Sequence, residues 1–86
     1  MRPSIVRKLE TLTLEESLQY LDATQGDELR AAQSLALDRS YLAGDSMNEP
    51  DETEVHHALF LLRRARGLAA PSFDTMRFQL RRRFAA

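Results

Sequence analysis

Apolar residues recur along this chain at intervals of three and four positions, the spacing that places side chains on one face of an α-helix. No segment shows the sustained alternation of apolar and polar residues that is typical of a half-buried β-strand. The pattern therefore predicts an all-α fold, a single compact domain of four to five helices joined by short loops. The expected helices cover residues of about 3–10, 14–23, 27–43, 52–66 and 73–84.

Polar residues at the expected helix starts support these boundaries. Thr13 with Glu16, and Asp51 with Glu54, have the spacing of a capping box, in which each side chain accepts a hydrogen bond from the backbone N–H of the other residue. Ser72 is a further expected N-cap. Glycine can adopt the left-handed conformation that ends a helix, and the expected stops are Gly44 and Gly67.

The helix expected over 52–66 is apolar on most of its sides, so we expect it to lie at the centre of the core. Its apolar positions are Val55, Ala58, Leu59, Leu61, Leu62 and Ala65, with Phe60 on the opposite side. Three of the other helices have a narrower apolar stripe that is expected to face this core. The stripes are Leu14, Leu18 and Leu21; Leu29, Ala32, Leu35, Ala36 and Leu42; and Phe73, Met76, Leu80 and Phe84.

Several large apolar side chains fall outside these stripes, among them Tyr20, Leu37, Tyr41 and Phe78. Leu37 and Tyr41 lie roughly opposite the main stripe of their helix. We expect another helix of the same chain to cover them, because soluble monomers avoid large exposed apolar patches. Phe78 lies on the outward face of the last helix. Either another element covers Phe78, or it is an exposed aromatic anchor for a partner, and the sequence leaves both open.

Composition indicates a single soluble domain. The chain has 86 residues, of which 43% are hydrophobic and 29% charged, as in ordinary globular proteins. It has no cysteine, so disulfides and thiolate metal sites are excluded. Its longest apolar run covers only 58–62, and its first residues lack the apolar stretch of a signal peptide. We therefore expect a cytoplasmic protein with no membrane span.

The net charge of −1 conceals a strong asymmetry. Residues 1–54 hold five basic residues and twelve acids, whereas residues 55–86 hold seven arginines and only one acid, Asp74. Such opposite charges can neutralise each other within the fold, pair between two copies, or present a charged patch to another molecule. The sequence does not choose among these three arrangements.

A helix, a short turn with glycine and a basic helix over 57–84 have the outline of a helix-turn-helix. Against DNA reading, the outward face of the last helix carries Asp74 and Phe78 together with arginines, and it has few polar side chains that read base edges. The acids of the first part also oppose contacts with phosphates. We therefore keep a helix-turn-helix-like nucleic-acid-binding regulator as the alternative function.

The chain lacks the residue patterns of common catalytic and metal sites. It has no cysteine nucleophile and no glycine-rich phosphate loop, and its three glycines lie at helix boundaries. His56 and His57 are adjacent, so on a helix they point about 100° apart and cannot both bind one ion. We expect no enzymatic activity, no metal and no other cofactor.

Residues 5–37 resemble a ubiquitin-associated domain in pattern. That family packs three short helices, and its acidic-apolar phrase between the second and third helix corresponds here to "EESLQYLDATQGD", residues 15–27. The family's ubiquitin-contacting Met-Gly-Phe loop would fall on Glu10, Thr11 and Leu12, none of which matches. The resemblance therefore implies a compact three-helix start, and it implies no ubiquitin-binding residues.

The function that these patterns favour is a small protein–protein interaction module: an adaptor, a regulator or an inhibitor. It would dock through the basic and aromatic face of the last helix. The predicted partner-binding residues are Arg77, Phe78, Arg81 and Arg82, since aromatics and arginine dominate binding hot spots. The expected partner is another protein with an acidic surface, or a second copy of the chain.

Overall fold

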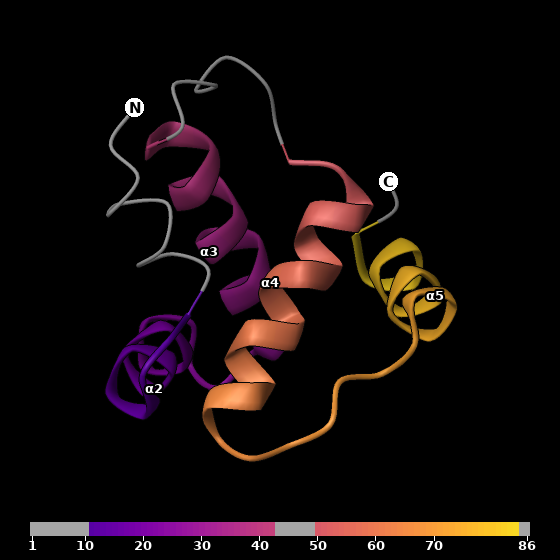
Figure 1. Cartoon of the computed structure of the whole chain (residues 1–86). Coiled ribbons are helices and arrows are strands. Elements are labelled where there is room, and N and C mark those ends of the chain that lie inside the picture. Colours follow the sequence, from indigo (N-terminus) through magenta and orange to yellow (C-terminus); the bar gives the residue numbers. More distant parts are fainter. Residues whose placement is uncertain (1–10, 43–49, 85–86) are drawn as a thin grey trace.

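Four α-helices make up the regular structure of residues 11–42 and 50–84, the parts of the chain that the computed structural model describes (Figure 1). They are α2 (Leu14–Ala23), α3 (Glu28–Leu42), α4 (Glu52–Ala65) and α5 (Phe73–Phe84). Neither described range contains a strand. The all-α prediction is confirmed for these residues, and each observed helix ends within one residue of its expected range.

Some expectations fall on other parts of the chain. The helix expected over 3–10 and the stop at Gly44 lie outside the described residues. The same holds for the side chains of Tyr41, Leu42 and Phe84, which occupy the ends of α3 and α5.

Side-chain caps start the helices where the sequence indicated. The Thr13 hydroxyl accepts from the Glu16 N–H, and the Glu16 carboxylate accepts from the Thr13 N–H, each at 3.1 Å, so the first capping box is present. At α4 the Asp51 carboxylate accepts from the Glu54 N–H at 2.8 Å. The Glu54 carboxylate instead accepts from the Ser40 hydroxyl at 3.3 Å, which links the start of α4 to α3.

The turn between α4 and α5 is also built as expected. Gly67 has φ of +74°, and the Leu68 N–H donates to the Arg63 carbonyl at 2.9 Å, as in a Schellman motif. The Ser72 hydroxyl then accepts from the Thr75 N–H at 3.2 Å and caps α5.

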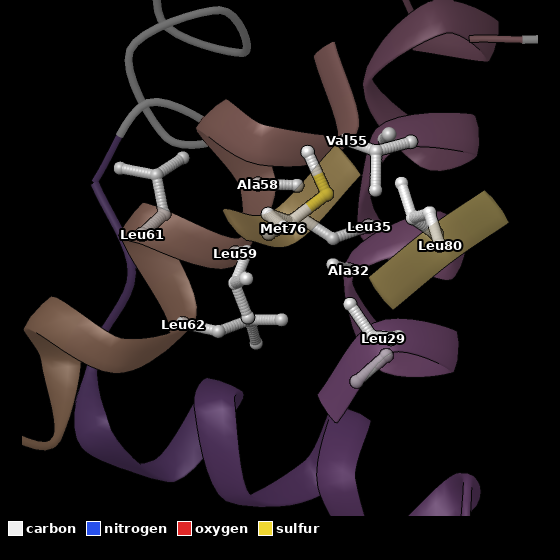
Figure 2. Close-up of a cluster of buried hydrophobic side chains, with 12 residues drawn as sticks. Leu29, Ala32, Leu35, Val55, Ala58, Leu59, Leu61, Leu62, Met76 and Leu80 are labelled. Carbon is white, nitrogen blue, oxygen red and sulfur yellow. The ribbon is translucent and has the colours of Figure 1, made fainter. Parts of the chain in front are cut away.

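The core is centred on the α3–α4 pair (Figure 2), and α2 and α5 lie at opposite edges of that pair (Figure 1). Ala32, Ala36 and Ala58 are buried along its length, and such small side chains let two helix backbones approach closely. Helix α4 contacts α2, α3 and α5, so its predicted central position is confirmed. The buried apolar residues are Leu29, Ala31, Ala32, Leu35, Ala36, Val55, Ala58, Leu59, Leu61, Leu62, Met76 and Leu80.

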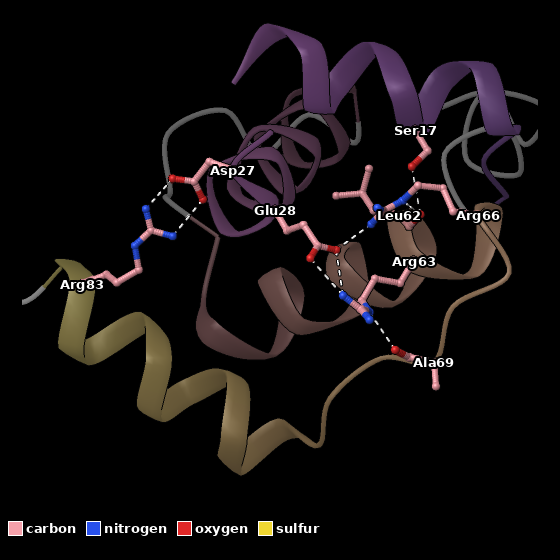
Figure 3. Close-up of polar contacts among 8 residues, drawn as sticks. All are labelled: Ser17, Asp27, Glu28, Leu62, Arg63, Arg66, Ala69 and Arg83. Atoms are coloured by element: carbon pink, nitrogen blue, oxygen red, sulfur yellow. Dashed lines mark hydrogen bonds and ion pairs between the residues drawn. The ribbon is translucent and has the colours of Figure 1, made fainter. Parts of the chain in front are cut away.

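Helix α2 packs through a different face from the one predicted. Leu14 and Leu18 are 53% and 50% exposed, whereas Ser17 is fully buried and its hydroxyl donates to the Leu62 carbonyl at 2.8 Å (Figure 3). Only Leu21 of the expected stripe packs against the core. The small serine lets α2 approach α4, and its hydrogen bond offsets the cost of burying a hydroxyl. The predicted Leu14–Leu18 contact with the core is therefore wrong.

The expectation that another helix covers Leu37 is also wrong, because this side chain is 49% exposed. Leu37 lies about 140° around α3 from Ala32, which faces α4. The burial of Ala32 and Ala36 therefore leaves Leu37 on the outward side of α3.

The packing of α2 can be tested by comparing two substitutions on neighbouring residues. Ser17→Leu is expected to lower the free energy of unfolding by about 1–3 kcal/mol, because the fully buried site has no room for a larger side chain. Leu18→Gln, which keeps helix propensity, is expected to cost less than about 0.5 kcal/mol. Urea unfolding followed by circular dichroism measures both values. The opposite order would contradict the observed orientation of α2.

Candidate partner-binding site

The rotation of α5 about its axis is set by the residues that it buries. Met76 and Leu80 enter the core, and Phe73 packs against it with its ring edge-on to His56, at 5.6 Å between ring centroids. The His56 Nε2 lies 2.8 Å from the Pro71 carbonyl, which makes the ring nitrogen the donor and ties the preceding loop to α4. These contacts determine which side chains of α5 remain outside.

Phe78 is 63% exposed, the largest exposed fraction among the large hydrophobic residues described. It lies about 160° around the helix from Met76, so the burial of Met76 directs Phe78 outward. Of the two possibilities that the sequence left open, exposure is the one observed. The three arginines predicted to accompany it, Arg77, Arg81 and Arg82, are exposed as well.

The four predicted residues divide between two sides of α5. The Arg81 guanidinium bonds to the Glu52 carboxylate at 3.2 Å, at the beginning of α4. Phe78 and Arg82 instead line an open groove on another side of the helix. Within the described residues, neither Arg77 nor Arg82 has an ion pair.

The groove has a volume of about 1060 Å³ and is formed by segments that are far apart in the sequence. One wall is a stripe of α5 comprising Thr75, Phe78, Gln79 and Arg82. The facing wall is the turn over 25–27 with the start of α3. Leu29 and Leu59 contribute to the lining from the core, and residues 69–71 close one side. Such a groove is open enough for a polypeptide segment.

An arginine clamp fixes the loop beside the groove (Figure 3). The Glu28 carboxylate accepts two hydrogen bonds of 2.9 Å from Arg63 and one of 2.5 Å from Arg66. Arg63 also donates through Nε to the Ala69 carbonyl at 2.6 Å. Because these side chains are only partly exposed, their charge-assisted bonds are weakly screened by water. One carboxylate thereby holds α3, α4 and the loop together.

A second ion pair joins α5 to the start of α3. The Arg83 guanidinium forms a bidentate pair with the Asp27 carboxylate, which also accepts from the Arg30 N–H at 3.2 Å (Figure 3). Hydrogen bonding from Arg83 is the main reason that the pKa of Asp27 lies below its ordinary value. Both residues of this pair line the groove, so the pair joins the α5 wall to the turn before α3.

These ion pairs account for much of the charge asymmetry in the sequence. Four of the seven arginines in residues 55–86 pair with acids in the first part of the chain: Arg63, Arg66, Arg81 and Arg83. Neutralisation within the fold is therefore the main use of the basic segment. A fifth arginine, Arg64, lies 5.9 Å from the ring centroid of Phe60. Arg77 and Arg82 are the remaining two.

The side chain of His57 on α4 has a partner on α3. The His57 Nδ1 lies 2.8 Å from the Arg39 guanidinium, and since arginine only donates, this nitrogen accepts. No three metal-binding side chains gather within residues 11–42 and 50–84. No helix in these ranges is long and apolar enough to cross a membrane.

Sequence reasoning missed a second exposed apolar surface, on α2. Leu14 and Leu18 border a shallow hollow of about 440 Å³ together with Glu15 and Asp22. The signal that could have revealed it is Ser17, because a buried small residue on a short helix permits close packing and turns the flanking leucines outward. The groove along α5 had no comparable local signal.

Comparison of the chain with family models, with curated proteins and with solved structures finds no match. The resemblance of residues 5–37 to ubiquitin-associated domains therefore receives no support from a family model.

The Glu28 clamp can be tested against a matched carboxylate. Glu28 and Glu52 are each the first residue of a helix, but Glu28 bonds two partly buried arginines and Glu52 one exposed arginine. Glu28→Gln is expected to lower the free energy of unfolding by about 1–3 kcal/mol, because it removes the negative charge and replaces one of the two acceptor oxygens by an NH₂ donor that faces the guanidinium groups. Glu52→Gln is expected to cost less than about 0.5 kcal/mol. Equal losses in urea unfolding would contradict the clamp.

The Asp27–Arg83 pair predicts a defined pH dependence. Because folding lowers the pKa of Asp27, its ionised carboxylate stabilises the fold above the ordinary pKa of 3.8, and this contribution is lost as the pH falls through that value and the lower folded value. Asp27→Asn removes the charge but can keep the hydrogen bond to the Arg30 N–H. Urea midpoints of wild type and variant should differ most at pH 7 and converge in acid. Arg83→Gln should show the same convergence, and a constant difference would contradict the pair.

Proposed function

We propose that this chain is a small, non-catalytic interaction module that docks on a partner protein through the exposed side of α5. The observation that carries the proposal is the 63% exposure of Phe78 beside Arg82, a guanidinium with no ion pair in the described residues. The two residues are four positions apart, so they lie on neighbouring turns of one helix face. Both line the groove.

The energetics of association favour Phe78 as the anchor. Burying a phenylalanine side chain is worth about 1.5–3 kcal/mol in transfer free energy. Little of this is gained in the folded monomer, because most of the ring stays in water. Aromatic residues lose few rotamers on binding, and together with arginine they are enriched among hot spots. Phe78 thus supplies binding energy that folding leaves unused.

The arginines contribute in different ways. Arg82 is placed to form a bidentate pair with a carboxylate of the partner, since it is exposed and has no acid partner among the residues that the structure describes. Arg77 offers a second charge on the other side of α5. Arg81 must share its guanidinium with Glu52 or exchange that exposed pair for a new one. We therefore place Phe78 and Arg82 at the centre of the interface and Arg77 and Arg81 at its rim.

The charge pairing supports a protein partner over nucleic acid. A DNA-binding surface gains affinity from each arginine that contacts a phosphate, whereas four of these arginines already bind carboxylates of the same chain. Asp74 is exposed on α5 itself. Binding of mixed-sequence duplex at low salt, with a steep loss of affinity as salt rises, would instead establish the helix-turn-helix alternative.

Phe78→Ala tests the proposal directly. A partner is first captured from cell extract with wild-type protein, then purified, and its affinity for each variant is measured by calorimetric titration. Phe78→Ala is expected to raise Kd by at least about tenfold, the loss typical of a hot-spot aromatic, with little change in the free energy of unfolding.

Phe60→Ala is the matched control. Phe60 is another exposed phenylalanine, but it lies on α4 and stacks on His57, with ring centroids 6.4 Å apart. Its replacement is expected to leave Kd unchanged. If the two variants bind the purified partner equally well, the role given to α5 is wrong.

A further inference from the structure

We propose that the groove along α5 binds an amphipathic helical segment of about two turns, which presents apolar side chains to the groove and a carboxylate to Arg82. This inference rests on the proposed interaction function and specifies the partner's chemistry. The groove was not part of the sequence-based prediction, because its lining comes from residues between 25 and 83.

The length and the shape of the expected segment follow from the α5 wall. Thr75, Phe78, Gln79 and Arg82 have the spacing of one continuous helical stripe, which extends about 10 Å at 1.5 Å per residue. A second helix laid alongside such a stripe can contact it over about two turns. Helix-in-groove binding uses this arrangement, with apolar anchors at helical spacing.

The lining explains why the inner face of the segment should be apolar. The apolar residues Leu29, Leu59, Ala70, Pro71 and Phe78 all line the groove. Leucine or phenylalanine side chains placed there would remove Phe78 from water while burying their own surface.

The charged side chains that line the groove favour an acidic segment. Two acids line the groove, but Asp27 is bonded to Arg83 and Glu28 is held by Arg63 and Arg66. These pairs leave Arg82 as the lining cation without an acid partner in the described ranges. A carboxylate would gain a charge-assisted pair there, whereas a lysine would meet a guanidinium of like charge.

A second copy of the chain is the other candidate occupant of the groove, and it must be distinguished from a different protein. Helix α2 has a matching chemistry, with exposed Leu14 and Leu18 beside Glu15 and Asp22. Yet α2 and α5 lie at opposite edges of the molecule (Figure 1), so docking α2 of one copy on α5 of the next is a heterologous contact that does not close a dimer and leaves one α2 and one α5 surface of the pair unoccupied. We therefore assign the groove to a different protein.

The test uses two synthetic fourteen-residue peptides with the same helical leucine and phenylalanine positions, one flanked by glutamates and the other by lysines. Fluorescence anisotropy measures their affinities for the whole chain, and amide shifts in ¹⁵N-labelled protein locate the binding. The acidic peptide is expected to bind at least about tenfold more tightly. It should shift the amides of Gly26, Ala70 and Gln79.

Arg82→Glu is expected to reverse the preference between the two peptides. Arg77→Glu is the matched control, since it makes the same change of charge on the same helix but does not line the groove. It should leave the preference in favour of the acidic peptide. If both peptides bind equally, if Arg77→Glu reverses the preference as Arg82→Glu does, or if the shifts fall elsewhere, the inference is wrong.

Further outcomes distinguish a failure of this inference from a failure of the proposed function. If the captured partner depends on Phe78 but the acidic peptide does not bind, the groove assignment fails and the proposed function stands. If the peptide binds the groove but no protein partner depends on Phe78, the proposed function fails. A mass that rises with concentration and returns to that of a monomer in Leu18→Gln would assign the groove to α2 of a second copy and overturn the inference.

Discussion

The close packing of α3 against α4 is the constraint on which the rest of the structure depends. Ala32 and Ala36 of α3 and Ala58 of α4 are buried in the shared core, where larger side chains would need space that a close-packed interior does not have. The other two helices dock on this pair: α2 through Ser17, which bonds to the Leu62 carbonyl, and α5 through Met76 and Leu80. Their orientations, and therefore the exposed faces, follow from the shape of the α3–α4 surface.

Local signals in the sequence were sufficient to predict the helices and insufficient to orient all of them. Capping residues such as Thr13 and Ser72 act within three or four positions, so sequence spacing reveals them. The face that α2 buries is decided by space on α4, and there a hydrogen-bonded Ser17 fits where Leu18 does not. Hydrophobicity alone ranks these residues in the wrong order, because it takes no account of how closely two helices must approach.

The candidate site also combines a feature that the sequence could indicate with features that it could not. The outward position of Phe78 follows from helical spacing, because Phe78 lies opposite Met76 on α5 and Met76 is buried. The sequence could therefore indicate that Phe78 is either exposed or covered by another element. The ion pairs could not be anticipated, since Glu28 and Arg63 are 35 positions apart and Asp27 and Arg83 are 56 apart. Of the predicted residues on α5, Arg81 pairs with Glu52, whereas Phe78 and Arg82 line the groove. The predicted cluster is therefore divided between two sides of the helix.

The same interactions that neutralise the charge also prepare the groove for binding. Arg63 bonds at once to Glu28 and to the Ala69 carbonyl, so the loop beside the groove is held by the contact that joins α3 to α4. The facing wall is tied to α5 by Asp27 and Arg83. A segment entering the groove would therefore meet walls that are already ordered, and association would not have to supply the conformational entropy of ordering them. Because the clamp serves both the fold and the groove, changes at Glu28 should affect binding through stability, whereas changes at Arg82 should affect binding alone.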